Sequence, residues 1–193
     1  MIIEKRIRTE VDICKRLEGE DLPKRRSSRW QHWNTTQDVN TCEDCAEKHG
    51  RIYAIGETPA QMPPLHEHCR CILEIMDAVE AEAACLDREQ GAPWWLFHRG
   101  ILPEYYIAID ALRGLGWRSG QNPDKYAPGK MLFLGVYPNT AGKLPDAPGR
   151  VWYEADIDYH GGRRGGHRVI WSNDGLMFVT YDHYATFIEV IGG

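Results

Sequence analysis

The stretch Gly149–Phe187 reads GRVWYEADIDYHGGRRGGHRVIWSNDGLMFVTYDHYATF and decides the fold. Its segments RVWYEADIDY, HRVIWS and LMFVTYDHY are rich in β-branched and aromatic residues, which is typical of strands. The connections HGGRRGG and NDG consist of residues that tight turns require. We therefore predict three short antiparallel strands here.

A fourth segment of strand composition, MLFLGVY, comes earlier, and helical patterns precede all four segments. Pro93 suits the first turn of a helix over Trp94–Arg99, and Gly100 would end that helix. The run LPEYYIAIDALRGLGW predicts a turn and a short helix that ends at Gly116. Helices packed on a following antiparallel sheet define the α+β class, which we predict for residues 93–193.

The chemical groups of the opening stretch fit one another. Glu154 and Asp156 are two apart on a strand and share a face, and Arg164 and Arg168 could face them across the sheet. With His183, they would supply a carboxylate base, an imidazole acid and fixed cations, which together can move a phosphoryl group without a metal. The alternatives are a salt bridge on a solvated sheet and an ordinary surface histidine.

The motifs around these residues resemble the barnase family of guanyl-preferring bacterial ribonucleases over about half the chain. The matching motifs are Leu102-Pro103, Leu115-Gly116-Trp117, Ala127-Pro128-Gly129-Lys130, Gly142-Lys143-Leu144-Pro145, Gly149-Arg150-x-Trp152-x-Glu154-Ala155-Asp156-Ile157, Ser172-x-Asp174 and Asp182-His183-Tyr184-x-Thr186-Phe187. The resemblance implies the microbial-ribonuclease fold. It also implies that Glu154 is the general base, that His183 is the general acid, and that Arg164 and Arg168 bind phosphate.

The resemblance further implies cleavage of single-stranded RNA through a 2′,3′-cyclic phosphate, without a cofactor. The implied substrate-binding residues are Tyr137, Asn139 and Tyr184. The chain departs from the family at three positions: Ile109 replaces a lysine, Gly135 an acidic residue, and Ala141 the acidic residue that recognises guanine. We expect catalysis to survive these changes, while base preference stays open.

Residues 30–75 contain a Cys/His pattern, with CxxC at Cys42 and Cys45 and then HEHCRC. Cysteines two residues apart can hold one tetrahedral zinc ion with two further ligands from a distant knuckle. We expect the set Cys42, Cys45, His66 and Cys69, with His68 and Cys71 as alternatives. Disulfides or reduced core thiols fit the pattern equally well.

The same pattern resembles the C-terminal part of phage minor head proteins of the Mu F-like type, over about a quarter of the chain. The residues that carry it are Trp33…Asp38…Thr41-Cys42-x-x-Cys45…Gly50…Pro64-x-His66-x-x-Cys69-Arg70-Cys71. The resemblance implies a module, assigned to residues 1–75, that occurs in virions and as a carrier of C-terminal toxins. Phage or delivery-system proteins are therefore the implied partners.

The remaining segments predict the connections. Near-helical apolar spacing predicts an amphipathic helix over Ile3–Leu17, followed by a basic linker through KRRSSR. Residues 72–92 are rich in Ala and Glu and predict a helix that ends near Gly91. We therefore place a helical linker at residues 76–92, between the module at 1–75 and a ribonuclease-like domain at 93–193.

Charge and hydropathy narrow the function classes. The net charge of −5 arises in residues 1–92, whereas residues 93–193 hold ten Lys/Arg against ten Asp/Glu. A neutral half with a local basic run suits a nucleic acid as substrate rather than as scaffold. No apolar run approaches the roughly 18 residues of a membrane span. MIIEKRIRTE lacks the apolar core of a signal peptide, which predicts a cytoplasmic site of synthesis with specialised delivery or packaging still open.

The leading hypothesis is therefore an endoribonuclease toxin behind a phage-head-like module, with a small acidic inhibitor of the barstar type protecting the producing cell. An alternative is a structural or adaptor protein of a phage particle, with a catalytically weakened ribonuclease-like fold. A third is a zinc-dependent nucleic-acid module formed by the Cys/His unit.

Overall fold

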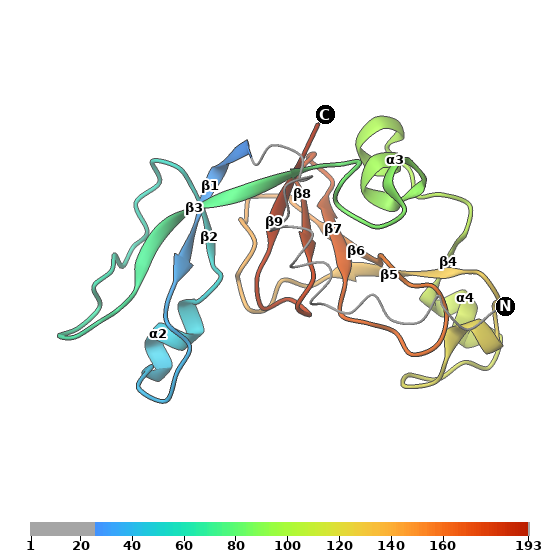
Figure 1. Cartoon of the computed structure of the whole chain (residues 1–193), viewed down its shortest axis with the longest axis horizontal. Helices are drawn as coiled ribbons and strands as arrows, with labels where there is room; N and C mark the ends of the chain where they lie inside the picture. The colour runs from blue at the N-terminus through green and yellow to red at the C-terminus, as the bar shows by residue number, and fades with distance from the viewer. Residues whose placement is uncertain (1–25, 193) are drawn as a thin grey trace, which may run out of the picture.

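A computed structural model describes residues 26–192, and the helix predicted over Ile3–Leu17 lies outside them. The described residues form one mixed sheet in the order β2-β1-β3-β9-β8-β7-β6-β5-β4 (Figure 1). Its strands are β1 (Arg26–Asn34), β2 (Ile52–Ala54), β3 (Ile72–Glu80), β4 (Tyr106–Ala108), β5 (Met131–Tyr137), β6 (Trp152–Asp156), β7 (Arg168–Ser172), β8 (Met177–Thr180) and β9 (Ile188–Ile191).

The sheet is accompanied by three short helices among the described residues: α2 (Glu43–Lys48), α3 (Ala92–Arg99) and α4 (Ile109–Gly114). Two 3₁₀ turns, η1 (Arg88–Gln90) and η2 (Pro123–Lys125), precede α3 and β5. The α+β class is confirmed. No helix formed by residues 26–192 has the length and apolar composition that crossing a bilayer would require.

Most elements predicted for the C-terminal half are confirmed. The segments expected as strands form β5, β6, β7 and β8, which pair antiparallel in that order. Helix α3 ends at Gly100, whose φ of 69° is the left-handed conformation that a glycine C-cap adopts without a steric penalty. Strands β4 and β9 were not predicted. The run expected as a turn and a short helix is helical only over Ile109–Gly114, because Tyr106–Ala108 pairs with the distant strand β5 and forms β4.

The helix predicted over residues 72–92 is wrong. Ile72–Glu80 is β3, which pairs antiparallel with β1 and parallel with β9. Ala and Glu favour a helix only locally, and here hydrogen bonding to two neighbouring strands outweighs that weak preference. The expected basic linker is also partly wrong, because Arg26–Arg29 begin β1.

The predicted boundary between the two domains is crossed by the sheet. Strand β3 runs from the part that contains α2 into the central sheet, where it lies beside β9 (Figure 1). One hydrogen-bonded sheet therefore contains described residues from all three of the ranges 1–75, 76–92 and 93–193. The division into these ranges stays a prediction about the sequence. In the described residues, strands from the three ranges belong to the same sheet.

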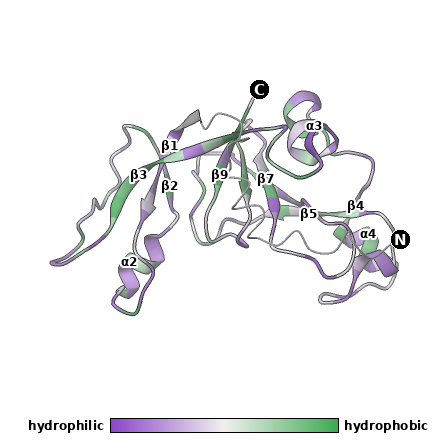
Figure 2. Cartoon of the chain, in the orientation of Figure 1, coloured by the Kyte–Doolittle hydropathy of each residue, from purple (hydrophilic) through white to green (hydrophobic). Residues whose placement is uncertain are grey.

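The two faces of the sheet bury different cores. On one face Ala155, Val169 and Val179 pack with Leu96 of α3. On the other face Trp152, Ile170 and Phe178 pack with Trp30, Ile52 and Met76. The register places Glu154 beside Ile170 and Asp156 beside Arg168, so these polar residues lie on the same face as the second core. In Figure 2, β7 and β9 carry hydrophobic residues, whereas α2 is mainly hydrophilic.

Candidate active site

Glu154 lies on β6 opposite Gly135 of β5 and is partly buried. The Tyr184 hydroxyl donates a hydrogen bond to its Oε2 at 2.6 Å. Burial raises the pKa of Glu154 above its usual value, while the Tyr184 hydrogen bond and the positive charge of Arg168 lower it. Because burial outweighs the opposing effects, Glu154 is a stronger base than an exposed glutamate.

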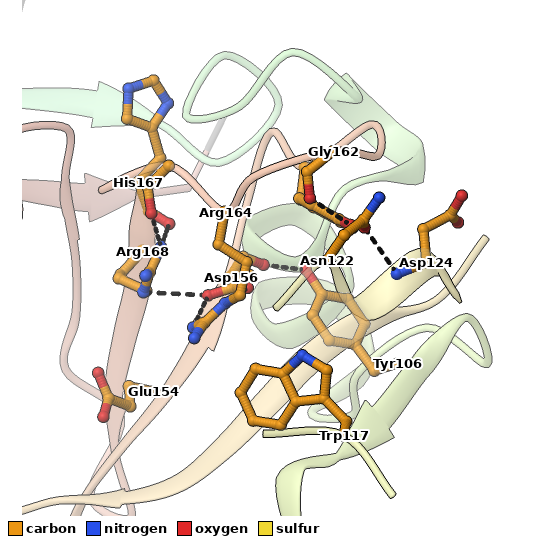
Figure 3. A network of polar contacts seen from close by, with 12 residues as sticks. Tyr106, Trp117, Asn122, Asp124, Glu154, Asp156, Gly162, Arg164, His167 and Arg168 are labelled. Carbon is orange, nitrogen blue, oxygen red and sulfur yellow. Dashed lines mark hydrogen bonds and ion pairs between the residues drawn. The ribbon is translucent and has the colours of Figure 1, made fainter. Parts of the chain in front are cut away.

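Asp156, two residues further along β6, holds both predicted phosphate-binding arginines. Its side chain is 1% exposed. Arg164 donates from Nε to Oδ2 and from Nη2 to Oδ1, both at 2.7 Å. The Nε atom of Arg168 lies 3.0 Å from Oδ1. Figure 3 shows both guanidinium groups directed at Asp156, with Glu154 further along the same strand.

The backbone on both sides of Asp156 is also fixed. Tyr106 donates from its hydroxyl to the Asp156 carbonyl oxygen at 2.5 Å. Arg168 donates from Nη1 to the carbonyls of Gly165 and His167, at 2.9 and 2.6 Å. Arg168 therefore ties the Gly-rich loop between β6 and β7 to the sheet. Two cations share one buried carboxylate, so the cluster keeps an excess positive charge beside Glu154.

His183 lies at an exposed, tight turn after β8. His183 and Tyr184 have φ values of 57° and 69°, the left-handed region that non-glycine residues rarely adopt. Asp182 accepts hydrogen bonds from the backbone N–H and hydroxyl of Thr186 at 2.9 and 2.6 Å. Thr180 also donates to Asp182 at 2.9 Å and accepts from the Tyr184 N–H at 3.0 Å. These bonds hold the strained turn.

The turn points its two aromatic side chains differently. Tyr184 bonds Glu154, while the His183 ring is solvent-exposed and contacts the Tyr184 ring with centroids 4.9 Å apart. The loop between β6 and β7 comes close to His183, since a Cβ atom on Gly166 would lie 3.1 Å from His183 Cβ. The structure thus connects Glu154 and His183 through Tyr184. The role of each residue in catalysis stays a prediction.

The predicted substrate-binding residues differ in whether their side chains are already engaged within the protein. Tyr137 stacks on Tyr184 with centroids 5.4 Å apart and planes at 21°. The Asn139 amide instead closes its own loop, donating to the Leu144 carbonyl at 2.9 Å and accepting from the Leu144 N–H at 3.1 Å. Tyr137 and Tyr184 therefore offer an aromatic surface beside Glu154, whereas the side chain of Asn139 shapes the loop.

The three departures from the family occupy distinct environments. Ile109 is partly buried against the small core around Leu112 and Trp117. Gly135 has a φ of 90° at an irregularity of β5, where Phe133 pairs with Ala155 and Gly135 with Glu154. Ala141 is exposed.

Sequence reasoning quoted Asp182 within a motif but missed what it does. Its spacing of four from Thr186 was the available signal, because an aspartate can bond backbone N–H groups of a following turn. The contribution of Lys143, whose ammonium group donates to the Tyr184 and Ala185 carbonyls, left no signal in the sequence, because these partners lie 41 and 42 residues further along the chain.

The Cys/His pattern also converges. His66 Nε2 lies 3.2 Å from Cys42 Sγ and 3.3 Å from Cys45 Sγ, and the sulfurs of Cys45 and Cys69 are 3.7 Å apart. Cys71 is buried and also lies near Cys45 and Cys69. The five cysteines within residues 26–192 are all free thiols. The expected ligands thus fall into two groups that share Cys45, one with Cys42 and His66 and the other with Cys69 and Cys71.

An α+β fold that carries a carboxylate and two arginines on one sheet face, with an exposed histidine on a nearby turn, suits the class of nucleases. Comparison with known proteins agrees. A family model described as ribonuclease matches residues 98–191, and one described as Phage Mu protein F like protein matches residues 6–74. Both resemblances predicted from the sequence are confirmed.

Individual relatives lead to the same family. A ribonuclease of Bacillus intermedius is 39% identical over 138 residues, which are 71% of this chain and 83% of that protein. Ribonucleases of Heyndrickxia coagulans and Bacillus pumilus are each 39% identical over 108 residues, 55% of this chain, and are covered over 99% and 67% of their own lengths. The chain belongs to the ribonuclease family, and this membership supports endoribonuclease activity.

The buried cluster around Asp156 makes a stability prediction. In Asp156→Asn two guanidinium groups lose their shared counter-charge, and we expect the free energy of unfolding to fall by about 3 kcal/mol. The matched control is Asp110→Asn, which removes the exposed ion pair with Arg113 and should cost less than about 1 kcal/mol. Urea denaturation of both variants measures the difference, and equal losses would contradict the role assigned to Asp156.

Proposed function

We propose that this protein is an endoribonuclease that cleaves single-stranded RNA by metal-independent transphosphorylation. The observation that carries the proposal is the environment of Glu154. A partly buried carboxylate with a raised pKa lies beside two arginines that share one buried aspartate, and Tyr184 joins it to the turn of His183. Membership of the ribonuclease family supports the same chemistry.

In the proposed reaction Glu154 takes the proton of a ribose 2′-hydroxyl, and the resulting oxygen attacks the neighbouring phosphorus. His183 gives a proton to the 5′-oxygen as the P–O5′ bond breaks, which leaves a 2′,3′-cyclic phosphate. With the roles exchanged, His183 takes a proton from water, the water oxygen opens the ring and Glu154 returns its proton. DNA lacks the attacking hydroxyl and is not a substrate.

Arg164 and Arg168 would stabilise the negative charge that grows on the non-bridging phosphate oxygens. Their anchoring on Asp156 matters because cations already oriented toward that charge need no reorganisation during the reaction. Asp156 offsets one of the two positive charges, and the remaining one suits a phosphodiester. The site thus supplies the charge stabilisation that a metal ion provides in other nucleases.

The test is to incubate the protein with single-stranded RNA in a chelator and follow cyclic-phosphate ends. Glu154→Ala and His183→Ala should each lower the rate by about 10²–10⁴-fold, because each removes one proton-transfer group. Glu82→Ala is the control, since Glu82 is exposed and pairs with Arg88 away from this face. Cleavage that persists unchanged in both site variants would remove this mechanism.

The presence of a Mu F-like domain beside the ribonuclease domain supports a role as a phage-derived or polymorphic-toxin effector. Such an enzyme, made in the cytoplasm, threatens the cell that makes it. We therefore propose a small acidic inhibitor of the barstar type, whose carboxylates pair with Arg164 and Arg168 and cover the site. Charge pairs of this kind fix the register of an interface and speed association, as in the barnase–barstar pair.

An inhibitor of this kind should be encoded beside this chain. Its product should form a one-to-one complex and abolish RNA cleavage, with an association rate that falls as salt is raised because the attraction is electrostatic. Stopped-flow mixing at low and high salt measures that rate. If no neighbouring reading frame encodes an inhibitor, the toxin role loses its support while the ribonuclease activity is unaffected.

The second candidate function is a structural or adaptor role in a phage particle, with a ribonuclease-like fold that no longer turns over. Ile109 and Ala141 favour it, because a family lysine and the guanine-recognising acid are missing there. Co-purification with capsid components together with no cleavage of RNA would select this function.

We also propose that Cys42, Cys45, His66 and Cys69 hold a structural zinc ion. A zinc–sulfur bond of about 2.3 Å puts two thiolates of a tetrahedron about 3.8 Å apart, and Cys45 and Cys69 are 3.7 Å apart. His66 Nδ1 lies 2.7 Å from the Glu67 carbonyl oxygen. A proton donated there leaves Nε2, the atom nearest both cysteines, as the metal ligand.

Elemental analysis of purified protein should find about one zinc per chain, because four ligands complete a tetrahedral site. Cys42→Ser and Cys69→Ser should lose the metal and melt at lower temperature. Cys85→Ser removes a buried thiol outside the cluster and should keep it. Zinc absent from the wild type, or retained in both cluster variants, would contradict the site.

A further inference from the structure

The turn that follows α2 reaches the loops of the candidate active site. Ile52 donates its backbone N–H to the Lys143 carbonyl oxygen at 2.8 Å. A Cβ atom on Gly50 would lie 2.7 Å from the Ala185 carbonyl oxygen and 3.4 Å from Lys143 Nζ. Gly50 therefore lies directly against two loops that come from the ribonuclease part of the chain.

Lys143 joins those two loops. Its ammonium group donates hydrogen bonds to the carbonyl oxygens of Tyr184 and Ala185, at 3.1 and 2.7 Å. Tyr184 in turn bonds Glu154, and His183 precedes it in the same turn. A continuous series of contacts thus runs from Gly50–Ile52 through Lys143 to the proposed base.

Apolar packing reinforces these contacts on the same sheet face. Trp30 and Ile52 are buried in one cluster with Leu144 and Phe187, and Tyr137 and Tyr184 pack against it. Trp30 contacts Phe178 with ring centroids 6.1 Å apart. The aromatic surface beside Glu154 therefore rests partly on side chains from β1 and β2.

The turn itself is anchored to the sheet. Gly50 donates its N–H to the Trp33 carbonyl at 2.9 Å, and Trp33 donates to the Arg51 carbonyl at 2.8 Å. Strand β1 is fixed by Glu189 of β9, which is 4% exposed. Its carboxylate accepts from Ser28 Oγ at 2.7 Å and from Trp30 Nε1 at 3.1 Å. Gly50 is therefore held in a fixed position relative to the central sheet, and so are the loops that it contacts.

We propose that the Gly50–Ile52 turn of the Mu F-like part positions the His183–Tyr184 turn for catalysis, with Lys143 as the link. The inference rests on the proposed function, and it makes this part of the chain a support of the active site as well as a carrier. The ribonuclease of Heyndrickxia coagulans matches over 99% of its length with only 55% of this chain. Nearly the whole of that relative is thus matched by about half of this chain.

The chain offers a matched pair of variants for the test. Gly50 and Gly56 have φ values of 79° and 89°, so Gly50→Ala and Gly56→Ala introduce similar backbone strain. Only Gly50→Ala puts a methyl group against Ala185, because nothing lies within 4 Å of a Cβ on Gly56. The second test variant is Lys143→Met, which removes the ammonium group and changes no residue of the Mu F-like part.

The first readout needs no activity: NMR titration of the Glu154 carboxyl in the full chain. The groups that face it are Tyr184, Arg168, Asp156, Arg164 and Tyr137. Displacing Tyr184 weakens the hydrogen bond that lowers the pKa of Glu154, so that pKa should rise in Gly50→Ala and Lys143→Met. Tyr184→Phe removes this hydrogen bond and shows the direction in which the Glu154 pKa should move. In Gly56→Ala the Glu154 pKa should equal that of the wild type.

The second readout is steady-state cleavage of RNA. We expect kcat to fall about tenfold or more in Gly50→Ala and Lys143→Met, because misplaced catalytic groups lower the rate of the chemical step. KM should change less. Gly56→Ala should keep the wild-type kcat.

The outcomes separate this inference from the proposed function. The positioning role would be overturned if Gly50→Ala and Lys143→Met had the same Glu154 pKa and the same kcat as Gly56→Ala. If the Glu154 pKa rises in Gly50→Ala and Lys143→Met but the wild-type protein cleaves no RNA, the positioning role is supported and the proposed activity is removed. If Gly50→Ala does not fold, Lys143→Met decides by the same two readouts.

Discussion

The buried carboxylate of Asp156 is the interaction on which the candidate site depends. It is almost fully excluded from solvent and accepts hydrogen bonds from Arg164 while Arg168 lies beside it. A buried charge without partners is costly, so the Gly-rich loop between β6 and β7 must return to the sheet and bring both cations with it. Because Glu154 lies two residues away on the same face, this one requirement also places positive charge next to the proposed base.

A second constraint joins the two parts of the chain. Strand β3 adds to the edge of the ribonuclease sheet beside β9, and Glu189 of β9 receives hydrogen bonds from Ser28 and Trp30. An edge strand left unpaired exposes backbone groups that seek another partner. Strand β3, which continues from the Mu F-like part, covers this edge with its last residues and so ties that part to the ribonuclease sheet.

The C-terminal half was largely predictable because its signals are local. Strand composition, turn residues between strands and a proline–glycine pair around α3 each act within a few residues. Strand β3 was mistaken for a helix because Ala and Glu favour helices in isolation, whereas its pairing partners lie far away in the sequence. In the site, Glu154 and the arginines were expected together, but their shared dependence on Asp156 was not.

By itself, the sequence determined the family, the strands β5 to β8 and the set of acid, base and cationic groups, since these follow from motif order and residue type. Only the tertiary structure decided that Tyr184 bonds Glu154, that Asn139 closes its own loop, and that Gly50 lies against Ala185. Tyr184 and Glu154 are 30 residues apart, and Gly50 and Ala185 are about 135 apart, so chain folding and not local preference brings these pairs together. Asn139 and Leu144 are only five residues apart, and their bonds depend on the conformation that their loop adopts in the folded protein.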